Sequence, residues 1–125
     1  MKPLRHARLW LLLWAVAIVA TIVVCLLPAT DLPKIAAGVD KIEHWLVYGV
    51  LAAAAVQLFA TRRALVTSAA GLLVLGIAIE FAQATLTMTR SGDPWDAAAD
   101  ALGILGGMAT ALTPWRDTLL RIDPA

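Results

Sequence analysis

A long stretch of uncharged, apolar residues from Leu9 to Thr30 places the strongest limit on how this chain can fold. At a rise of about 1.5 Å per residue, a helix over this stretch crosses the roughly 30 Å hydrocarbon core of a bilayer. Further apolar stretches fill most of the chain, so that 61% of its 125 residues are hydrophobic and 15% are charged. A soluble domain of this size cannot bury so many apolar side chains. The sequence therefore predicts an integral membrane protein.

The apolar stretches predict an all-α fold, a single domain over residues 1–125 that forms an antiparallel four-helix transmembrane bundle. Membrane strands would need an alternating pattern, which these continuous stretches lack. Because the links between the stretches are short, successive helices are expected to lie antiparallel. The first stretch is longer than the apolar core of a signal peptide, so we expect a retained membrane helix. The predicted helices cover residues 9–29, 41–61, 64–88 and 94–113.

Lysine and arginine residues are divided unevenly between the two ends of this bundle. Cytoplasmic loops of membrane proteins carry the excess of these residues. One end holds three of them, Lys34, Lys41 and Arg90. The other end holds seven, so both termini are expected to lie in the cytoplasm. The seven are Lys2, Arg5, Arg8, Arg62, Arg63, Arg116 and Arg121.

Glu80 is a polar residue that helix capping cannot explain. It lies about 22 Å along the third predicted helix, inside the hydrocarbon core. An ionisable residue at that depth costs about 2.5–3.5 kcal/mol on insertion scales and usually faces the interior of a bundle. Gln83 lies on the same face of the helix. We expect Glu80 to pair with Lys41 or His44, and the structural alternative is a glutamate that only joins helices.

The fourth predicted helix carries two acids and two glycines on one face. Asp96, Asp100, Gly103 and Gly107 recur at helical spacing, and glycines four apart allow membrane helices to pack closely. We therefore expect this face to point into the bundle. Asp93, which is followed by a proline, is typical of the residue that caps a helix N-terminus.

The order of the four spans brings polar residues together at one membrane face. The start of the second span, the end of the third and the start of the fourth all reach that face, the periplasmic one in the predicted orientation. No comparable set of polar residues is expected at the opposite end. For Asp40 and Asp96, stabilisation of a helix N-terminus is the alternative role. The candidate functional residues are Asp40, Lys41, His44, Glu80, Gln83, Arg90, Asp96 and Asp100.

Four segments resemble those of the VanZ-like membrane proteins. Residues 40–48 resemble the family's D-K-x-x-H-x-x-x-Y motif, and residues 76–83 resemble its G-x-x-x-E-x-x-Q motif. Residues 90–96 resemble its R-x-x-x-x-x-D segment, and residues 102–107 fit the glycine-rich helix that follows. The order and spacing of these segments are specific, and the resemblance extends over roughly residues 9–113.

The resemblance implies a small protein of the bacterial inner membrane. The family takes its name from resistance to the glycopeptide antibiotic teicoplanin, so a role in the cell envelope is expected. The resemblance implies no biochemical mechanism. One position departs from the family pattern. Asp100 stands where the family usually has asparagine, which adds a potential charge where a neutral amide would be expected.

The polar residues are compatible with several functions. In the first, they bind the head group of a membrane lipid or a lipid-linked envelope precursor, and Lys41, His44 and Arg90 hold its phosphate. In the second, Glu80 or His44 is the general base of an enzyme, although the chain carries no recognisable nucleophile motif. A proton-coupled transporter would require a homo-oligomer, because four helices are too few for an inverted-repeat pathway. A structural protein without a ligand is the remaining alternative.

Cofactors, metals and nucleic acids are not expected partners of this chain. One histidine and several carboxylates could converge on a metal ion, but a metal site ranks low because only one histidine would contribute to it. Cys25 is the single cysteine, so it cannot form an intrachain disulfide. A net charge of +1 provides no basic surface for nucleic acid.

Overall fold

The structure, a computed structural model, describes residues 1–27, 39–88 and 92–125. Four long helices and a short C-terminal one account for most of these residues, and no β-strand occurs among them. The all-α class is therefore confirmed. The helices are α1 (Ala7–Leu26), α2 (Val39–Leu58), α3 (Arg62–Leu86), α4 (Pro94–Ala109) and α5 (Thr118–Ile122), with two 3-10 turns, η2 (Thr110–Leu112) and η3 (Pro114–Asp117), before α5.

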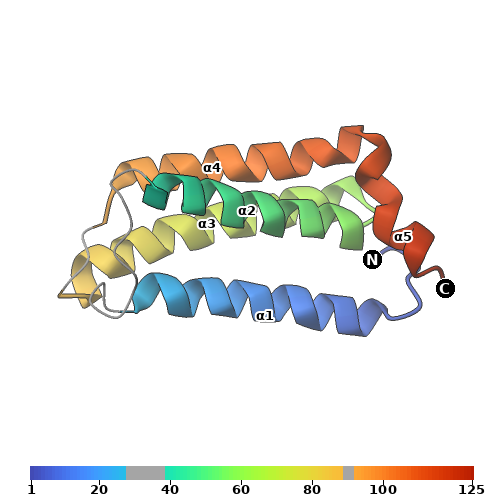
Figure 1. The fold of residues 1–125 in the computed structure, drawn as a ribbon, viewed down its shortest axis with the longest axis horizontal. Helices are drawn as coiled ribbons and strands as arrows, with labels where there is room; N and C mark the ends of the chain where they lie inside the picture. Colours follow the sequence, from blue (N-terminus) through green and yellow to red (C-terminus); the bar gives the residue numbers. More distant parts are fainter. Residues whose placement is uncertain (28–38, 89–91) are drawn as a thin grey trace.

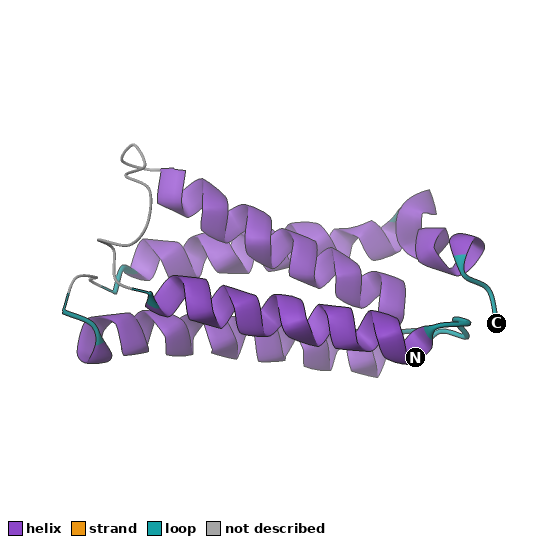
Figure 2. Ribbon diagram, turned by 60° about the horizontal axis from the view of Figure 1, so that its bottom comes forward, coloured by secondary structure: helices purple, strands orange, loops and turns teal. Residues whose placement is uncertain are grey.

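The four long helices lie side by side, and the chain reverses direction from each to the next (Figures 1 and 2). Among them, α2 and α4 pack most closely, whereas none of the residues of α1 is buried. Two of the four, α1 and α3, are long and apolar enough to cross a membrane. The termini meet at one end of the molecule, where an isolated bridge joins Leu4 to Pro124.

The helix ends follow local sequence signals. Asp93 caps α4 as predicted, because its side chain accepts a hydrogen bond from the backbone N–H of Trp95 at 2.9 Å. The α-helical part of this span ends at Ala109, four residues earlier than expected. Thr113 is extended, as is usual for a residue that precedes proline, and here Pro114 starts a new 3-10 turn.

Small residues explain the close contact between α2 and α4. A Cβ atom added at Gly103 would overlap the carbonyl oxygen of Trp45, and one added at Gly107 would overlap that of Gly49. The predicted glycine face of α4 therefore points into the bundle. Its counterpart on α2 includes Gly49 and Ala52, which the sequence analysis did not single out.

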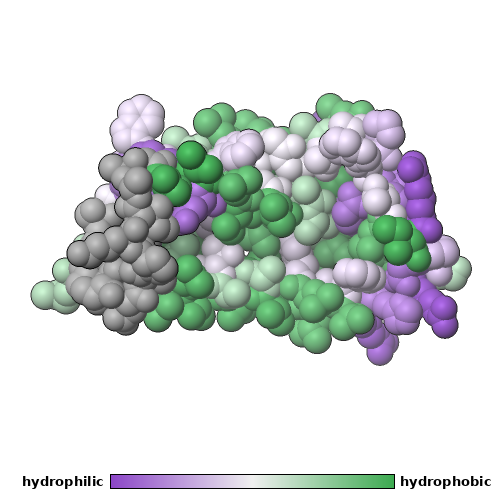
Figure 3. Space-filling model, in the orientation of Figure 1, coloured by the Kyte–Doolittle hydropathy of each residue, from purple (hydrophilic) through white to green (hydrophobic). Residues whose placement is uncertain are grey.

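The outer surface of the bundle is apolar along much of its length. Figure 3 shows apolar side chains across the middle of one face and hydrophilic ones gathered at the end where the termini lie. Large side chains such as Val50, Phe81 and Leu105 are each more than 60% exposed. Such a surface is unfavourable in water and suits the hydrocarbon core of a bilayer.

Candidate functional site

Three helices bring polar side chains together at the end of the bundle opposite the termini. The first turns of α2, the last turns of α3 and the first turns of α4 supply them, as the order of the spans predicted. We call this group the polar cluster. Its members are Lys41 and His44 from α2, Glu80 from α3, and Asp93, Asp96 and Asp100 from the start of α4.

Lys41 is surrounded by acids. Its Nζ atom lies 2.7 Å from Asp93 Oδ2, 2.9 Å from Asp96 Oδ1 and 3.6 Å from Asp40 Oδ2. The ammonium group of Lys41 and the backbone N–H of Trp95 hold the pKa of the Asp93 carboxyl below its ordinary value. Lys41 thus ties α2 to the start of α4, and its charge is already neutralised within the protein.

His44 and Asp100 form the second polar contact between α2 and α4. His44 Nδ1 lies 2.9 Å from Asp100 Oδ1, and the aspartate is only 1% exposed. The other carboxylate oxygen of Asp100 and the hydroxyl of Tyr48 are buried without a hydrogen-bond partner among the described residues. Both atoms lie over Gly76, where a Cβ atom would come within 2.5 Å of the Asp100 oxygen. A glycine is needed at this point of α3 so that the aspartate can fit.

Only one of the two carboxylate oxygens of Glu80 has a hydrogen-bond partner among the described residues. Its Oε2 atom accepts a hydrogen bond from the backbone N–H of Asp93 at 2.8 Å. Its Oε1 atom is buried and has no partner in the described part of the chain. The expected pairing of Glu80 with Lys41 or His44 is therefore wrong. Lys41 instead contacts Asp93 and Asp96, and Glu80 binds the backbone of Asp93, the residue that caps α4.

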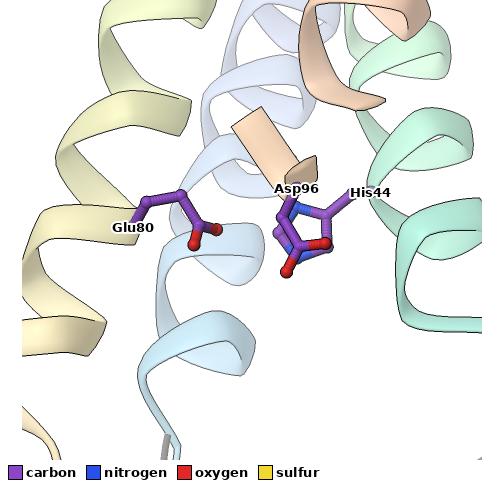
Figure 4. Close-up of side chains that lie close together, drawn as sticks. All are labelled: His44, Glu80 and Asp96. Carbon is purple, nitrogen blue, oxygen red and sulfur yellow. The ribbon is translucent and has the colours of Figure 1, made fainter. Parts of the chain in front are cut away.

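Three side chains of the polar cluster converge on one point. One ligand atom from each of His44, Glu80 and Asp96 lies within 4.8 Å of the other two. In Figure 4 the Glu80 carboxylate extends from α3 toward Asp96 and His44, which lie next to each other. Glu80 is 8% exposed and Asp96 is 7% exposed. An imidazole and two carboxylates are thus gathered in a largely buried space.

The remaining candidate residues lie outside this convergence. Gln83 is buried on α3 and donates a hydrogen bond from Nε2 to the carbonyl oxygen of Cys25 at 2.8 Å. That carbonyl belongs to the last turn of α1, where helix carbonyls lack helical partners. Gln83 therefore attaches α1 to α3. Asp40 lies exposed in the first turn of α2, and Arg90 lies outside the described residues.

A pocket of about 300 Å³ lies between α1 and α2, beside the polar cluster. His44 and Tyr48 contribute to its wall, so one side of the cluster borders it. The remaining lining is largely apolar on the α1 side and partly acidic on the α2 side. The lining residues are Ala20, Thr21, Val24, Cys25, Asp40, Glu43, His44, Val47 and Tyr48.

A second set of polar contacts joins the two termini at the opposite end of the bundle. Asp123 accepts from the backbone N–H of His6 at 3.0 Å and from the indole N–H of Trp10 at 2.9 Å, and His6 Nδ1 lies 2.7 Å from it. These groups hold the pKa of the Asp123 carboxyl below its ordinary value. Lys2 is 5% exposed and pairs with Asp117 at 2.9 Å. The expectation that this end carries no comparable polar set is therefore wrong.

This second set of polar contacts could not be predicted from the sequence because its charged members and His6 lie outside the apolar stretches. Lys2 and His6 are separated from their partners by more than a hundred positions, so no local spacing links them. In the sequence, Tyr48 stands out only as the last residue of the segment 40–48. Its burial beside Asp100 depends on packing against α3 and α4. The sequence signal for this packing is Gly76, because a glycine one turn before Glu80 allows another helix to approach α3 closely.

Comparisons of the chain with family models, with curated proteins and with solved structures found no match.

Proposed function

We propose that this chain is a multi-pass protein of the bacterial inner membrane, a cell-envelope factor related to the VanZ-like proteins. In this proposal all four long helices span the membrane, both termini lie in the cytoplasm, and the polar cluster lies at the periplasmic face. The hydropathy of α1 and α3, the exposed apolar surface and the uneven distribution of Lys and Arg support the topology. The four sequence segments described above support the family.

We further propose that the polar cluster binds the head group of a membrane lipid or of a lipid-linked envelope precursor. The pocket between α1 and α2 is the observation that carries this proposal. It combines an apolar wall, suited to an acyl or prenyl chain, with His44 and Tyr48 from the border of the polar cluster. A ligand with one polar and one apolar end matches such a lining. None of the residues of α1 is buried, so α1 packs loosely against the rest of the bundle. A lipid would enter the pocket from the bilayer, between α1 and α2.

Native mass spectrometry of the purified protein tests this proposal. We expect a lipid to co-purify, and we expect Val24→Trp, which fills the pocket, to reduce its occupancy about tenfold or more. Val74→Trp is the matched control, because Val74 is exposed on α3 and does not line the pocket between α1 and α2. Equal lipid retention by both variants, or no retained lipid in the wild type, would overturn the proposal.

An intramembrane enzyme is a second candidate, and the contact between His44 and Asp100 favours it. A carboxylate bound to one ring nitrogen fixes the orientation of an imidazole, which then accepts a proton through its other nitrogen. Turnover of the co-purified lipid by the wild type but not by His44→Gln would support this candidate. Unchanged lipid after prolonged incubation would exclude it for that ligand.

A further inference from the structure

We infer that His44, Glu80 and Asp96 form a binding site for one divalent metal ion. The inference begins with the positions of the three donor atoms, which lie within 4.8 Å of one another. Protein ligands to a divalent transition metal lie at about 2.0–2.2 Å, so donors on opposite sides of one ion are about 4 Å apart. Small side-chain rotations would bring the three groups to that geometry.

The second observation is the unsatisfied oxygen of Glu80. Its side chain is more than nine-tenths buried and is directed toward His44 and Asp96 (Figure 4), and Oε1 has no partner among the described residues. A buried carboxylate oxygen without a partner is unfavourable, because its hydration is lost and nothing replaces it. A metal ion at the point of convergence would supply the missing interaction.

The contact between Asp100 and His44 is the arrangement that a metal-binding histidine needs. Metal-bound histidines commonly donate their second ring N–H to a carboxylate, which fixes the orientation of the ring. Here Nδ1 of His44 faces Asp100 Oδ1 at 2.9 Å. Nε2 is then the ring nitrogen available to an ion. Asp100 is therefore a positioning residue of the proposed site.

The balance of charge also favours a cation. Five carboxyl groups lie in or beside this region, those of Asp40, Glu80, Asp93, Asp96 and Asp100. Among the described residues, Lys41 is the lysine that faces them, and it is already in contact with three. A divalent ion would offset the negative charge of the buried carboxyl groups, those of Glu80, Asp96 and Asp100.

The ligand set points to a particular class of ion. Imidazole suits zinc and iron, whereas carboxylates suit manganese and magnesium, so one histidine with two carboxylates favours a first-row ion such as Mn²⁺, Fe²⁺ or Zn²⁺. Three protein ligands leave at least one coordination position open. If the proposed function holds, on which this step rests, the phosphate of a lipid head group would take that position. The ion would then replace Lys41 as the positive charge that holds the phosphate.

Metal titration of the full-length protein in detergent tests this site. The protein is stripped with a chelator and titrated with Mn²⁺, which is followed by the loss of the free-ion paramagnetic resonance signal, and with Co²⁺, which is followed by visible absorption. We expect one ion per chain, with affinity reduced about tenfold or more in Glu80→Gln and in Asp96→Asn. Asp117→Asn removes a carboxyl at the opposite end of the bundle and should bind as the wild type does.

Two outcomes would overturn the inference. One is a folded wild-type protein that binds neither Mn²⁺ nor Co²⁺ at a defined stoichiometry. The other is binding that Glu80→Gln and Asp96→Asn leave unchanged. The wild-type titration shows whether the protein binds one ion per chain, and this result does not depend on the folding of any variant. Metal binding without a retained lipid would remove the head-group proposal alone, and a retained lipid without metal binding would remove this inference alone.

Discussion

His44 Nδ1 lies 2.9 Å from Oδ1 of Asp100, across the contact between α2 and α4. The two residues are separated by 56 positions in the chain, and the aspartate is almost completely buried. Gly103, three residues after Asp100, packs against the backbone of Trp45, the residue after His44. The chemistry of the polar cluster is therefore coupled to the packing of α2 against α4.

Replacement of Asp100 separates the role of its charge from the role of its hydrogen bond. We expect Asp100→Asn to fold normally, because the amide oxygen still accepts from His44. We expect Asp100→Ala to lower the free energy of unfolding by about 1–3 kcal/mol, since the buried imidazole then loses its partner. Thermal unfolding in detergent compares the two variants. Equal destabilisation by both would show that the charge itself is needed.

Replacement of Glu80 tests whether this residue only joins helices. We expect Glu80→Gln to insert and fold, because the amide oxygen still accepts from the backbone N–H of Asp93, but to lose activity. A deletion strain complemented with the variant, and scored for an envelope phenotype such as glycopeptide susceptibility, provides the measurement. Complementation at normal expression would instead assign Glu80 a structural role.

Two neighbouring glycines of α4 provide a matched test of helix packing. We expect Gly107→Ala to destabilise the protein by about 1–3 kcal/mol, because the new methyl group would overlap the carbonyl oxygen of Gly49. Gly106→Ala should be neutral or slightly stabilising, since nothing lies within 4 Å of its added Cβ. Unfolding measured side by side under one detergent condition checks both. Similar stability of the two variants would contradict the α2–α4 packing.

Reporter fusions test the proposed orientation. Fusions after Thr61 and after Ala125 are expected to report the cytoplasm, and a fusion near Gly92 is expected to report the periplasm. The reason is the excess of Lys and Arg at the end of the bundle that holds the termini. Opposite readings at all three positions would reverse the orientation and would leave the grouping of the polar residues intact.

The contacts of Asp123 should depend on pH in a defined direction. Its pKa is lowered in the folded protein, so its contribution to stability is fully present above the ordinary aspartate range, about pH 4. That contribution is lost as the pH falls through the lowered value, when the carboxyl takes up a proton. We expect the fluorescence of Trp10 to change over this acidic range in the wild type. Asp123→Asn should remove the change, and its persistence in that variant would assign it to another group.

The sequence predicted the helical class and the end of the bundle at which the polar cluster lies, because these follow from local properties. Apolar length predicts helices in a bilayer, and the order of spans brings the ends of α2, α3 and α4 together. Asp93 could be predicted as a helix cap because its signal, an aspartate before proline, is contained in two residues.

The individual partners could not be predicted, because they depend on side-chain directions across helices. Lys41 and His44 both lie near acids, yet Lys41 contacts Asp93 and Asp96 while His44 contacts Asp100. Which acid each of them meets depends on the rotation of α4, and Gly103 and Gly107 set that rotation through backbone contact. The convergence of His44, Glu80 and Asp96 is a result of the same packing.

The contact of Asp123 with His6 and Trp10 joins segments that are synthesised at different times. α1 is synthesised before the other described helices and none of its residues is buried, and the aspartate that holds its start is synthesised after all four long helices. The attachment of its other end, through Gln83, requires α3. Both ends of α1 therefore lack these partners until later segments have been made, and the indole N–H of Trp14, which donates to the carbonyl oxygen of Leu51 at 2.9 Å, supplies an earlier contact with α2.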